Sequence, residues 1–200
     1  MIYYIFKYII LPFYWLLRMP KVTGMKNTGA ILHGKAIIIS NHRTNLDPLL
    51  LALTMPRFIH FMAKQELFET KAGSLLFKSL LVFPVNRKST DMKSMKKAIE
   101  VLDEGKVFGI FPEGKRCVTD DIDEFENGAA FFAIKTDAPI LPVYIPKDNF
   151  RLFKRPRLYV GEAILPAEYN NFSGSKSAAV RNLSAIFAER IDALREMAGD

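Results

Sequence analysis

The sequence places a histidine and an aspartate close together, directly after an apolar run. His42 and Asp47 lie in the segment NHRTNLDP, which follows Lys35–Ser40. A histidine whose ring is held by a carboxylate can accept a proton near neutral pH. The pair therefore indicates general-base chemistry, provided that the fold brings the two side chains together.

The spacing of this pair dictates how the chain must fold around it. Five residues turn about 140° around a regular helix, so His42 and Asp47 would not share one helical face. We expect a strand that ends at Asn41 and a helix that begins with Asp47 as its cap and Pro48 at its first position. The turn between them can return the carboxylate to the imidazole. Alternatively, Asp47 only caps its helix and His42 is an ordinary loop histidine. The spacing alone favours this second reading.

A second apolar run, Val107–Phe111, leads into the segment PEGKRC. In α/β folds, ligands bind at the carboxyl ends of strands. There Gly114 permits close backbone approach, and Arg116 can bind a phosphate through two parallel hydrogen bonds. The stretch from Gly109 to Lys115 is similar to a nucleotide phosphate loop. It lacks the magnesium-binding Ser or Thr, because Arg116 occupies that position. The segment therefore predicts an anion site without a nucleotide.

Two further features concern possible chemistry. Arg87 and Lys88 follow the apolar run Leu80–Val85, although a charge pair of this kind is by itself more often solvated than functional. Cys117 is the single cysteine, and no G-x-S-x-G segment occurs. We interpret Cys117 as a small residue beside the site and expect no covalent acyl-enzyme.

The rest of the pattern alternates short β-branched runs with helical periodicity, which predicts an α/β fold. The expected strands are Lys35–Ser40, Phe58–Ala63, Leu80–Val85, Val107–Phe111, Ile140–Ile145 and Leu158–Ile164. The expected helices are Pro48–Thr54, Gly73–Ser79, Asp91–Glu104, Gly128–Thr136 and a closing helix near Ser177–Met197. Two prolines in Ala138–Ile145 suggest an edge strand there.

Composition bounds the class of protein. The chain has 200 residues, half of them apolar, which suits one domain with one core. A net charge of +7 and a pI near 9.4 favour anionic partners. Nucleic acid is not expected, because the basic residues form no recognisable groove-reading motif. One cysteine points to a reducing, cytosol-facing location. His33, His42 and His60 lack ligand spacing, so we expect neither a metal nor a cofactor.

The first 19 residues combine apolar, aromatic and basic side chains. Lys7 and Arg18 bracket an uncharged run of only ten residues, too short for a span of roughly 20. A helical stripe is formed by Ile2, Ile5, Phe6, Ile9, Ile10, Phe13, Leu16 and Leu17. We expect residues 1–19 to form an amphipathic helix in a membrane interface, kinked at Pro12, followed by a catalytic domain over residues 20–200. The alternative is a helix packed on the domain.

Taken together, these segments resemble the glycerolipid acyltransferase family, which includes the 1-acyl-glycerol-3-phosphate acyltransferases. The resemblance covers roughly residues 20 to 165. The motif N-H-x4-D matches at Asn41, His42 and Asp47, and an arginine-ended motif matches at Arg87. The motif F-P-E-G-x-R matches at Phe111 to Arg116, and a proline-centred motif matches at Pro142. Lys115 and Cys117 stand where the family often has threonine and serine.

The resemblance implies a mixed sheet flanked by helices and direct acyl transfer. His42 would act as the general base and Asp47 would orient it. The substrate-binding set would be Asn41, Arg87, Glu113, Gly114, Lys115 and Arg116. The acceptor would be a lysophospholipid, with lysophosphatidic acid as the expected one, and the donor would be an acyl thioester of acyl carrier protein or coenzyme A. The protein would sit on anionic phospholipid at the cytoplasmic face of the cell membrane, as a peripheral or monotopic protein.

Three alternatives remain open at the level of sequence. The acceptor could be another lysolipid or glycerol 3-phosphate. The chain could also be a non-catalytic membrane-binding module, which would use its basic surface, although the presence of both His42 and Asp47 argues against this. The sequence does not decide between the two donors.

Overall fold

The computed structural model describes residues 2–5, 8–9, 20–86, 91–112, 127–149, 155–171 and 175–200. Its centre is a seven-stranded sheet with the order β1-β7-β6-β2-β5-β3-β4. The strands are β1 (Lys21–Thr23), β2 (Ala36–Ser40), β3 (Ile59–Lys64), β4 (Val82–Val85), β5 (Val107–Ile110), β6 (Ile140–Tyr144) and β7 (Arg157–Val160). All neighbouring pairs are parallel except β6 and β7. The predicted mixed sheet is confirmed.

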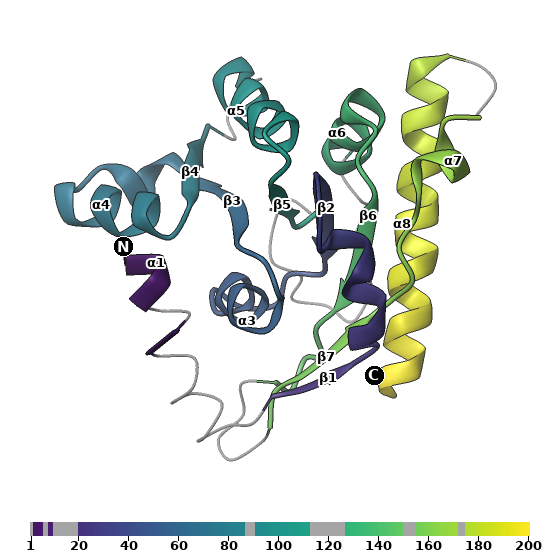
Figure 1. Cartoon of the computed structure of the whole chain (residues 1–200), viewed down its shortest axis with the longest axis horizontal. Helices are drawn as coiled ribbons and strands as arrows, with labels where there is room; N and C mark the ends of the chain where they lie inside the picture. Colours follow the sequence, from purple (N-terminus) through teal and green to yellow (C-terminus); the bar gives the residue numbers. More distant parts are fainter. Residues whose placement is uncertain are drawn as a thin grey trace.

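Helices cover both faces of this sheet (Figure 1). One face carries α5 (Met92–Asp103), α6 (Gly128–Thr136) and α8 (Lys176–Ala198), and the other carries α3 (Asp47–Thr54) and the 3-10 helix η2 (Met25–Ile31). In β2, Ile37 and Ile39 join the core under α5, α6 and α8, whereas Ala36 and Ile38 join the core under α3. An all-apolar strand of this kind is expected where both faces of a sheet are buried.

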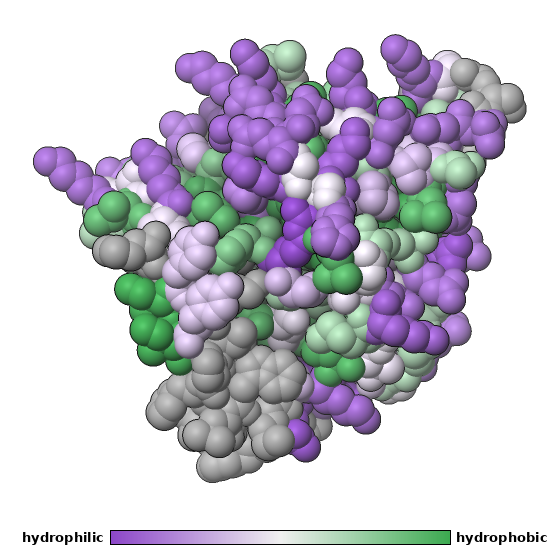
Figure 2. All heavy atoms as spheres, in the orientation of Figure 1, coloured by the Kyte–Doolittle hydropathy of each residue, from purple (hydrophilic) through white to green (hydrophobic). Residues whose placement is uncertain are grey.

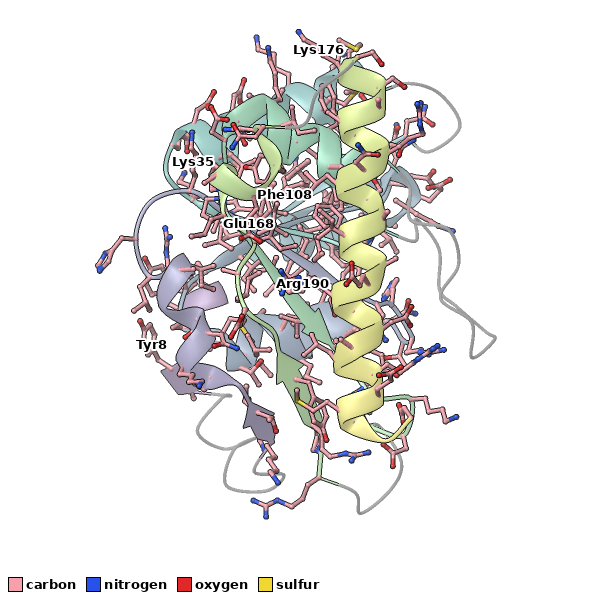
Figure 3. The ribbon with its side chains drawn as sticks, turned by 90° about the vertical axis from the view of Figure 1, so that its right-hand side faces the viewer. Tyr8, Lys35, Phe108, Glu168, Lys176 and Arg190 are labelled. Carbon is pink, nitrogen blue, oxygen red and sulfur yellow. The ribbon has the colours of Figure 1, made fainter. Side chains whose placement is uncertain are left out.

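The long closing helix α8 begins and ends with clear signals. Ser175 caps its first turn by accepting a hydrogen bond from the Ala178 amide, and Gly199 ends it with a left-handed φ of 73°. Its buried face includes Leu183, Phe187 and Ile191. Figure 3 shows Arg190 of α8 and Glu168 of the short helix α7 (Pro166–Tyr169), which form an ion pair at 3.4 Å.

The prediction that β6 is an edge strand was wrong, and one strand of the sheet was not predicted. β6 is not an edge strand, because it lies between β7 and β2. Pro142 is tolerated there because the pairing changes register: Ile140 pairs with Ile164, whereas Val143 pairs with Val160, so three steps on β6 oppose four on the other strand. The Pro142 carbonyl still accepts a bond from the Gly161 amide. The three-residue strand β1 was missed because it is too short to show a period.

A group of short elements follows β3 and leads to the edge of the sheet. The 3-10 helix η3 (Gln65–Phe68) leads into α4 (Lys71–Ser79), which Thr70 caps, and α4 returns the chain to the edge strand β4. Near α4 lies α1 (Ile2–Ile5). Most of the predicted N-terminal helix, residues 6–7 and 10–19, lies outside the described residues. No helix in the described part of the chain has the length and apolarity that crossing a membrane requires.

Candidate active site

The central strand β2 delivers His42 to the carboxyl edge of the sheet. β2 lies between β5 and β6, and residues 41–46 form the turn between Ser40 and α3. Asn41 is 1% exposed, and its amide group makes two hydrogen bonds to the Ile145 backbone. Its Nδ2 donates to the Ile145 carbonyl at 2.9 Å, and its Oδ1 accepts from the Ile145 amide at 2.7 Å. These bonds anchor the start of the turn to the end of β6.

The aspartate at the end of the turn points back to the histidine. Asp47 Oδ2 lies 3.0 Å from His42 Nδ1. The same oxygen accepts the backbone N–H groups of Arg43 and Thr44, each at 2.6 Å, and the Thr44 hydroxyl donates to Oδ1 at 2.9 Å. Asp47 is fully buried, whereas the His42 side chain is 16% exposed. The carboxylate is thus fully hydrogen-bonded, and the imidazole is the member of the pair that solvent and substrate can reach.

The predicted cap of α3 needs a correction. Leu46 occupies the N-cap position, Asp47 is the first helical residue, and Pro48 lies in the first turn. Asp47 does not cap the helix with its side chain, because its carboxylate is used by the preceding turn. The alternative in which Asp47 is only a helix cap is therefore excluded by the geometry.

An aromatic stack supports the imidazole. The ring of Phe111, which follows β5, lies 4.3 Å from the His42 ring at an angle of 25°. Phe61 of β3 stacks on Phe111 at 6.0 Å. A side chain at Gly109 would overlap the Phe61 ring, so the glycine of β5 makes room for this stack. Phe111 was recognised in the sequence only as part of a motif, and its contact with His42 was not predicted.

The other predicted site residues follow strands that end at the same edge. Arg87, Glu113, Gly114, Lys115 and Arg116 lie outside the described residues, as do Lys88 and Cys117. Asn86, which precedes Arg87, donates its backbone N–H to Asp91 Oδ2 at 2.9 Å. This bond, followed by those from Ser94 and Lys93, lowers the pKa of the Asp91 carboxyl. The segment that carries Arg87 thus begins and ends at anchored residues.

A cavity of about 1200 Å³ opens beside this edge, on the face that carries α5, α6 and α8. Phe111 belongs to its wall, so the cavity reaches the residue that stacks on His42. The residues that line the cavity are partly apolar and partly polar. The apolar ones are Met62, Val85, Met95, Ile110, Phe131, Phe132, Ile134 and Val180, and the polar ones are Asn86, Asp91, Ser94, Asn127, Lys135, Lys176 and Ser177. Such a wall suits a ligand with an apolar chain and a polar head.

Three residues near the carboxyl edge of the sheet were not predicted from the sequence to have a role. Thr44 and Arg43 lie inside the recognised segment but were given no role, although both hold Asp47 through their backbone amides. Nothing in the sequence indicated a role for Tyr144, because a buried tyrosine at the end of a strand is an ordinary core residue.

Comparison with known proteins agrees with this geometry. The family described as Acyltransferase matches residues 20–146. A 1-acyl-sn-glycerol-3-phosphate acyltransferase of Bacillus subtilis (strain 168) is 33% identical over 138 residues, which are 66% of this chain and 68% of the relative. An enzyme of the same name from Borreliella burgdorferi is 34% identical over 130 residues, which are 64% of this chain but only 51% of the relative.

A solved structure shares the fold. The crystal structure of the 1-acyl-sn-glycerophosphate (LPA) acyltransferase PlsC from Thermotoga maritima superposes with a TM-score of 0.70 at 22% identity. The match covers 95% of this chain and 77% of that structure. The family match spans more than half of the chain and includes both His42 and Asp47. The chain therefore belongs to the acyltransferase family and is an acyltransferase.

Proposed function

We propose that this enzyme transfers a fatty acyl group from an acyl thioester to the sn-2 hydroxyl of lysophosphatidic acid, giving phosphatidic acid for phospholipid synthesis. The observation that carries the proposal is the 3.0 Å contact between His42 Nδ1 and the buried Asp47 carboxylate. The printed names of the relatives, 1-acyl-sn-glycerol-3-phosphate acyltransferases, support this acceptor.

The geometry defines the roles of the pair. With Asp47 accepting from Nδ1–H, the tautomer of His42 carries its lone pair on Nε2. Nε2 takes the proton of the acceptor hydroxyl while that oxygen forms a bond to the thioester carbonyl carbon. The carbon–sulfur bond then breaks, and the thiolate takes the proton from His42. Asp47 stabilises the transient imidazolium and is not itself protonated. General-base assistance of this kind contributes about 10²–10⁴-fold.

The acceptor phosphate is assigned to Arg87 and Arg116, with Glu113 and Lys115 beside it and Gly114 permitting close approach. Arg87 follows β4 and Arg116 follows β5, and β3 alone separates these two strands. Strands two positions apart are about 10 Å from each other, a gap that two arginine side chains can close around one phosphate. Asn41 was predicted to bind substrate, and the described hydrogen bonds of its side chain are with the Ile145 backbone.

The donor is either acyl carrier protein or coenzyme A, and the same chemistry serves both. The assay that tests the proposal uses the purified chain with lysophosphatidic acid and each acyl donor in turn, and follows the free thiol. Lysophosphatidylcholine, lysophosphatidylglycerol and glycerol 3-phosphate serve as competing acceptors. We expect the highest catalytic efficiency with lysophosphatidic acid. Thiol release that does not depend on any acceptor would contradict the proposed transfer, as would a stronger preference for another lysolipid.

A covalent intermediate is tested separately. Cys117→Ser should retain activity, because the mechanism transfers the acyl group directly to the acceptor. A folded but inactive Cys117→Ser protein would instead favour an acyl-cysteine intermediate.

Membrane attachment is proposed for residues 1–19, on the cytoplasmic face. The described side chains of Tyr4, Ile5, Tyr8 and Ile9 are exposed, and Figure 2 shows apolar surface on the left, in the region of α1 and α4. The Tyr4 ring also lies 5.0 Å from Phe58, so part of the segment contacts the domain. Deleting residues 1–19 should release the protein from vesicles of phosphatidylglycerol while sparing activity on a short-chain acceptor in detergent. Undiminished vesicle binding would contradict this assignment.

A further inference from the structure

The two neighbours of His42 are tied to Tyr144, the last residue of β6, and to Ile145, which follows it. On one side, the Asn41 amide group holds the Ile145 backbone through two hydrogen bonds. On the other side, the Arg43 side chain reaches the Tyr144 hydroxyl, where its hydrogen bonding and its charge oppose the rise in the pKa of Tyr144 that burial causes. His42 is therefore held between two attachments to the same strand, and the second attachment depends entirely on side chains.

The second attachment continues to the end of α8. The Tyr144 hydroxyl donates to Asp200 Oδ2 at 3.0 Å, and the Lys147 backbone N–H donates to the same oxygen at 3.1 Å. Asp200 directly follows Gly199, the residue that ends α8. A continuous line of hydrogen bonds therefore joins the end of the last helix to the residue beside His42.

The charges along this line are complementary. Tyr144 is fully buried, and this burial, together with the Asp200 carboxylate, raises the pKa of Tyr144 to about 12. The hydroxyl therefore keeps its proton at neutral pH, donates it toward Asp200, and accepts from the Arg43 guanidinium. A neutral hydroxyl thus lies between a cation and an anion, and networks of this kind restrict the positions of their members.

Arg43 connects this line to the catalytic pair. Its backbone N–H donates to Asp47 Oδ2 at 2.6 Å, and that oxygen also contacts His42 Nδ1. The residue whose side chain is held by Tyr144 thus holds the catalytic carboxylate with its main chain. A shift of Arg43 would move the carboxylate away from the imidazole.

We propose that Arg43, Tyr144 and Asp200 form a positioning relay that fixes the catalytic turn on the C-terminal side of His42. The relay rests on the proposed role of His42 as the general base, and its three members act through the turn rather than on the substrate. Loss of the relay should slow the chemical step and leave the binding of both substrates nearly unchanged.

The main test compares two buried tyrosines in the full-length chain. Tyr144→Phe removes the hydroxyl of the relay. Tyr169→Phe is the matched control, because the Tyr169 hydroxyl is also buried and donates to the backbone carbonyls of Ala138 and Ala133. We expect Tyr144→Phe to lower kcat by about 10-fold, with both KM values within about 2-fold, since small displacements of reacting groups are costly. Tyr169→Phe should lower Tm but leave kcat unchanged.

A double-mutant cycle tests whether the members act together. Arg43→Ala and Tyr144→Phe should lower kcat by no more in combination than the stronger single change does, because both break the same line. Additive losses of kcat would overturn the relay even if each variant were slow. Asp200→Ala, at an exposed position that should not prevent folding, should lower kcat by about 3-fold.

Independent readouts separate this proposal from the proposed function. Wild-type kcat in both Tyr144→Phe and Asp200→Ala would overturn the relay, and if His42→Ala were inactive the general-base role would stand. If Tyr144→Phe failed to fold, Asp200→Ala alone would decide. If the wild-type chain showed no acyl transfer, the ring signals of His42 in NMR spectra would still test the relay. They should move in Tyr144→Phe and stay in Tyr169→Phe, and unmoved signals would overturn it.

Discussion

The two edges of the same sheet use charge in opposite ways. At the carboxyl edge, the Asp47 carboxylate accepts hydrogen bonds from the backbone N–H groups of Arg43 and Thr44. At the amino edge, the Arg57 guanidinium donates hydrogen bonds to the backbone carbonyls of Ile31, Gly34 and Gly105. Each ion thus fixes a cluster of loops by satisfying main-chain groups. Among the described residues, the carboxyl edge adds a histidine that is paired with a buried carboxylate.

The histidines at the two edges show the same difference. His42 has a buried carboxylate partner at 3.0 Å. His60 of β3 has its Nδ1 buried with no hydrogen-bond partner among the described residues, and hydrogen bonding to the Val107 backbone only partly offsets the lowering of its pKa. Burial, followed by the nearby Lys106, lowers the pKa of His60. A half-buried histidine without a carboxylate partner among the described residues is a structural residue, and a histidine paired with a carboxylate near solvent is a candidate base.

The largest expected effect comes from removing His42, the candidate base at the carboxyl edge. His42→Ala should reduce kcat by at least about 100-fold with an unchanged fold, since the loss of a general base costs about 10²–10⁴-fold. Asp47→Asn should remove most of the activity as well, because an amide does not hold the same tautomer. His60→Ala is the control, and its kcat should stay close to that of the wild type. Steady-state kinetics with circular dichroism on each variant provide the measurement. More than about a tenth of wild-type turnover in His42→Ala would refute the mechanism.

The next largest effect is expected from the two arginines that we assign to the acceptor phosphate at the carboxyl edge. Arg87→Ala and Arg116→Ala should each lower catalytic efficiency toward lysophosphatidic acid by about 10–100-fold, because a charged hydrogen bond contributes roughly 1.5–3 kcal/mol. The KM for the thioester donor should change much less. Equal effects on donor and acceptor would show that these arginines do not bind the phosphate.

A third test concerns the cation at the amino edge. Arg57→Ala should lower the free energy of unfolding by about 2–4 kcal/mol, since three carbonyls lose a charged donor. At a temperature where the variant is folded, its kcat should match that of the wild type. Urea titration and kinetics measure the two quantities. A large loss of kcat without loss of stability would mean that the amino edge takes part in function.

The smallest expected effect is the pH dependence that His60 contributes to stability. Because its pKa is lowered in the folded state, the unfolded chain binds more protons below about pH 6.5. Its contribution is therefore fully present above that value and is lost as the pH falls toward the folded-state pKa. The Tm of the wild type should fall between about pH 7 and pH 5 more than that of His60→Asn. Parallel curves for the two proteins would contradict this.

Much of the fold was determined by local patterns in the sequence. β-branched runs predicted six of the strands, and the apolar period of three and four predicted α8 nearly to its ends. Those signals are strong because burial on both faces of the sheet requires continuous apolar runs. The segment NHRTNLDP also indicated a possible chemistry, since its turn could bring Asp47 back to His42, and the structure confirms this contact.

Tertiary structure alone decided what surrounds that pair. The sequence could not place Phe111 on the His42 ring or join Tyr144 to Arg43, because these contacts depend on strand order and not on spacing along the chain. The interior position of β6 was likewise invisible, since a proline is excluded from an inner strand only if no bulge accommodates it. Local residue types indicated the candidate reacting groups, and the order β6-β2-β5 determined what holds them in place.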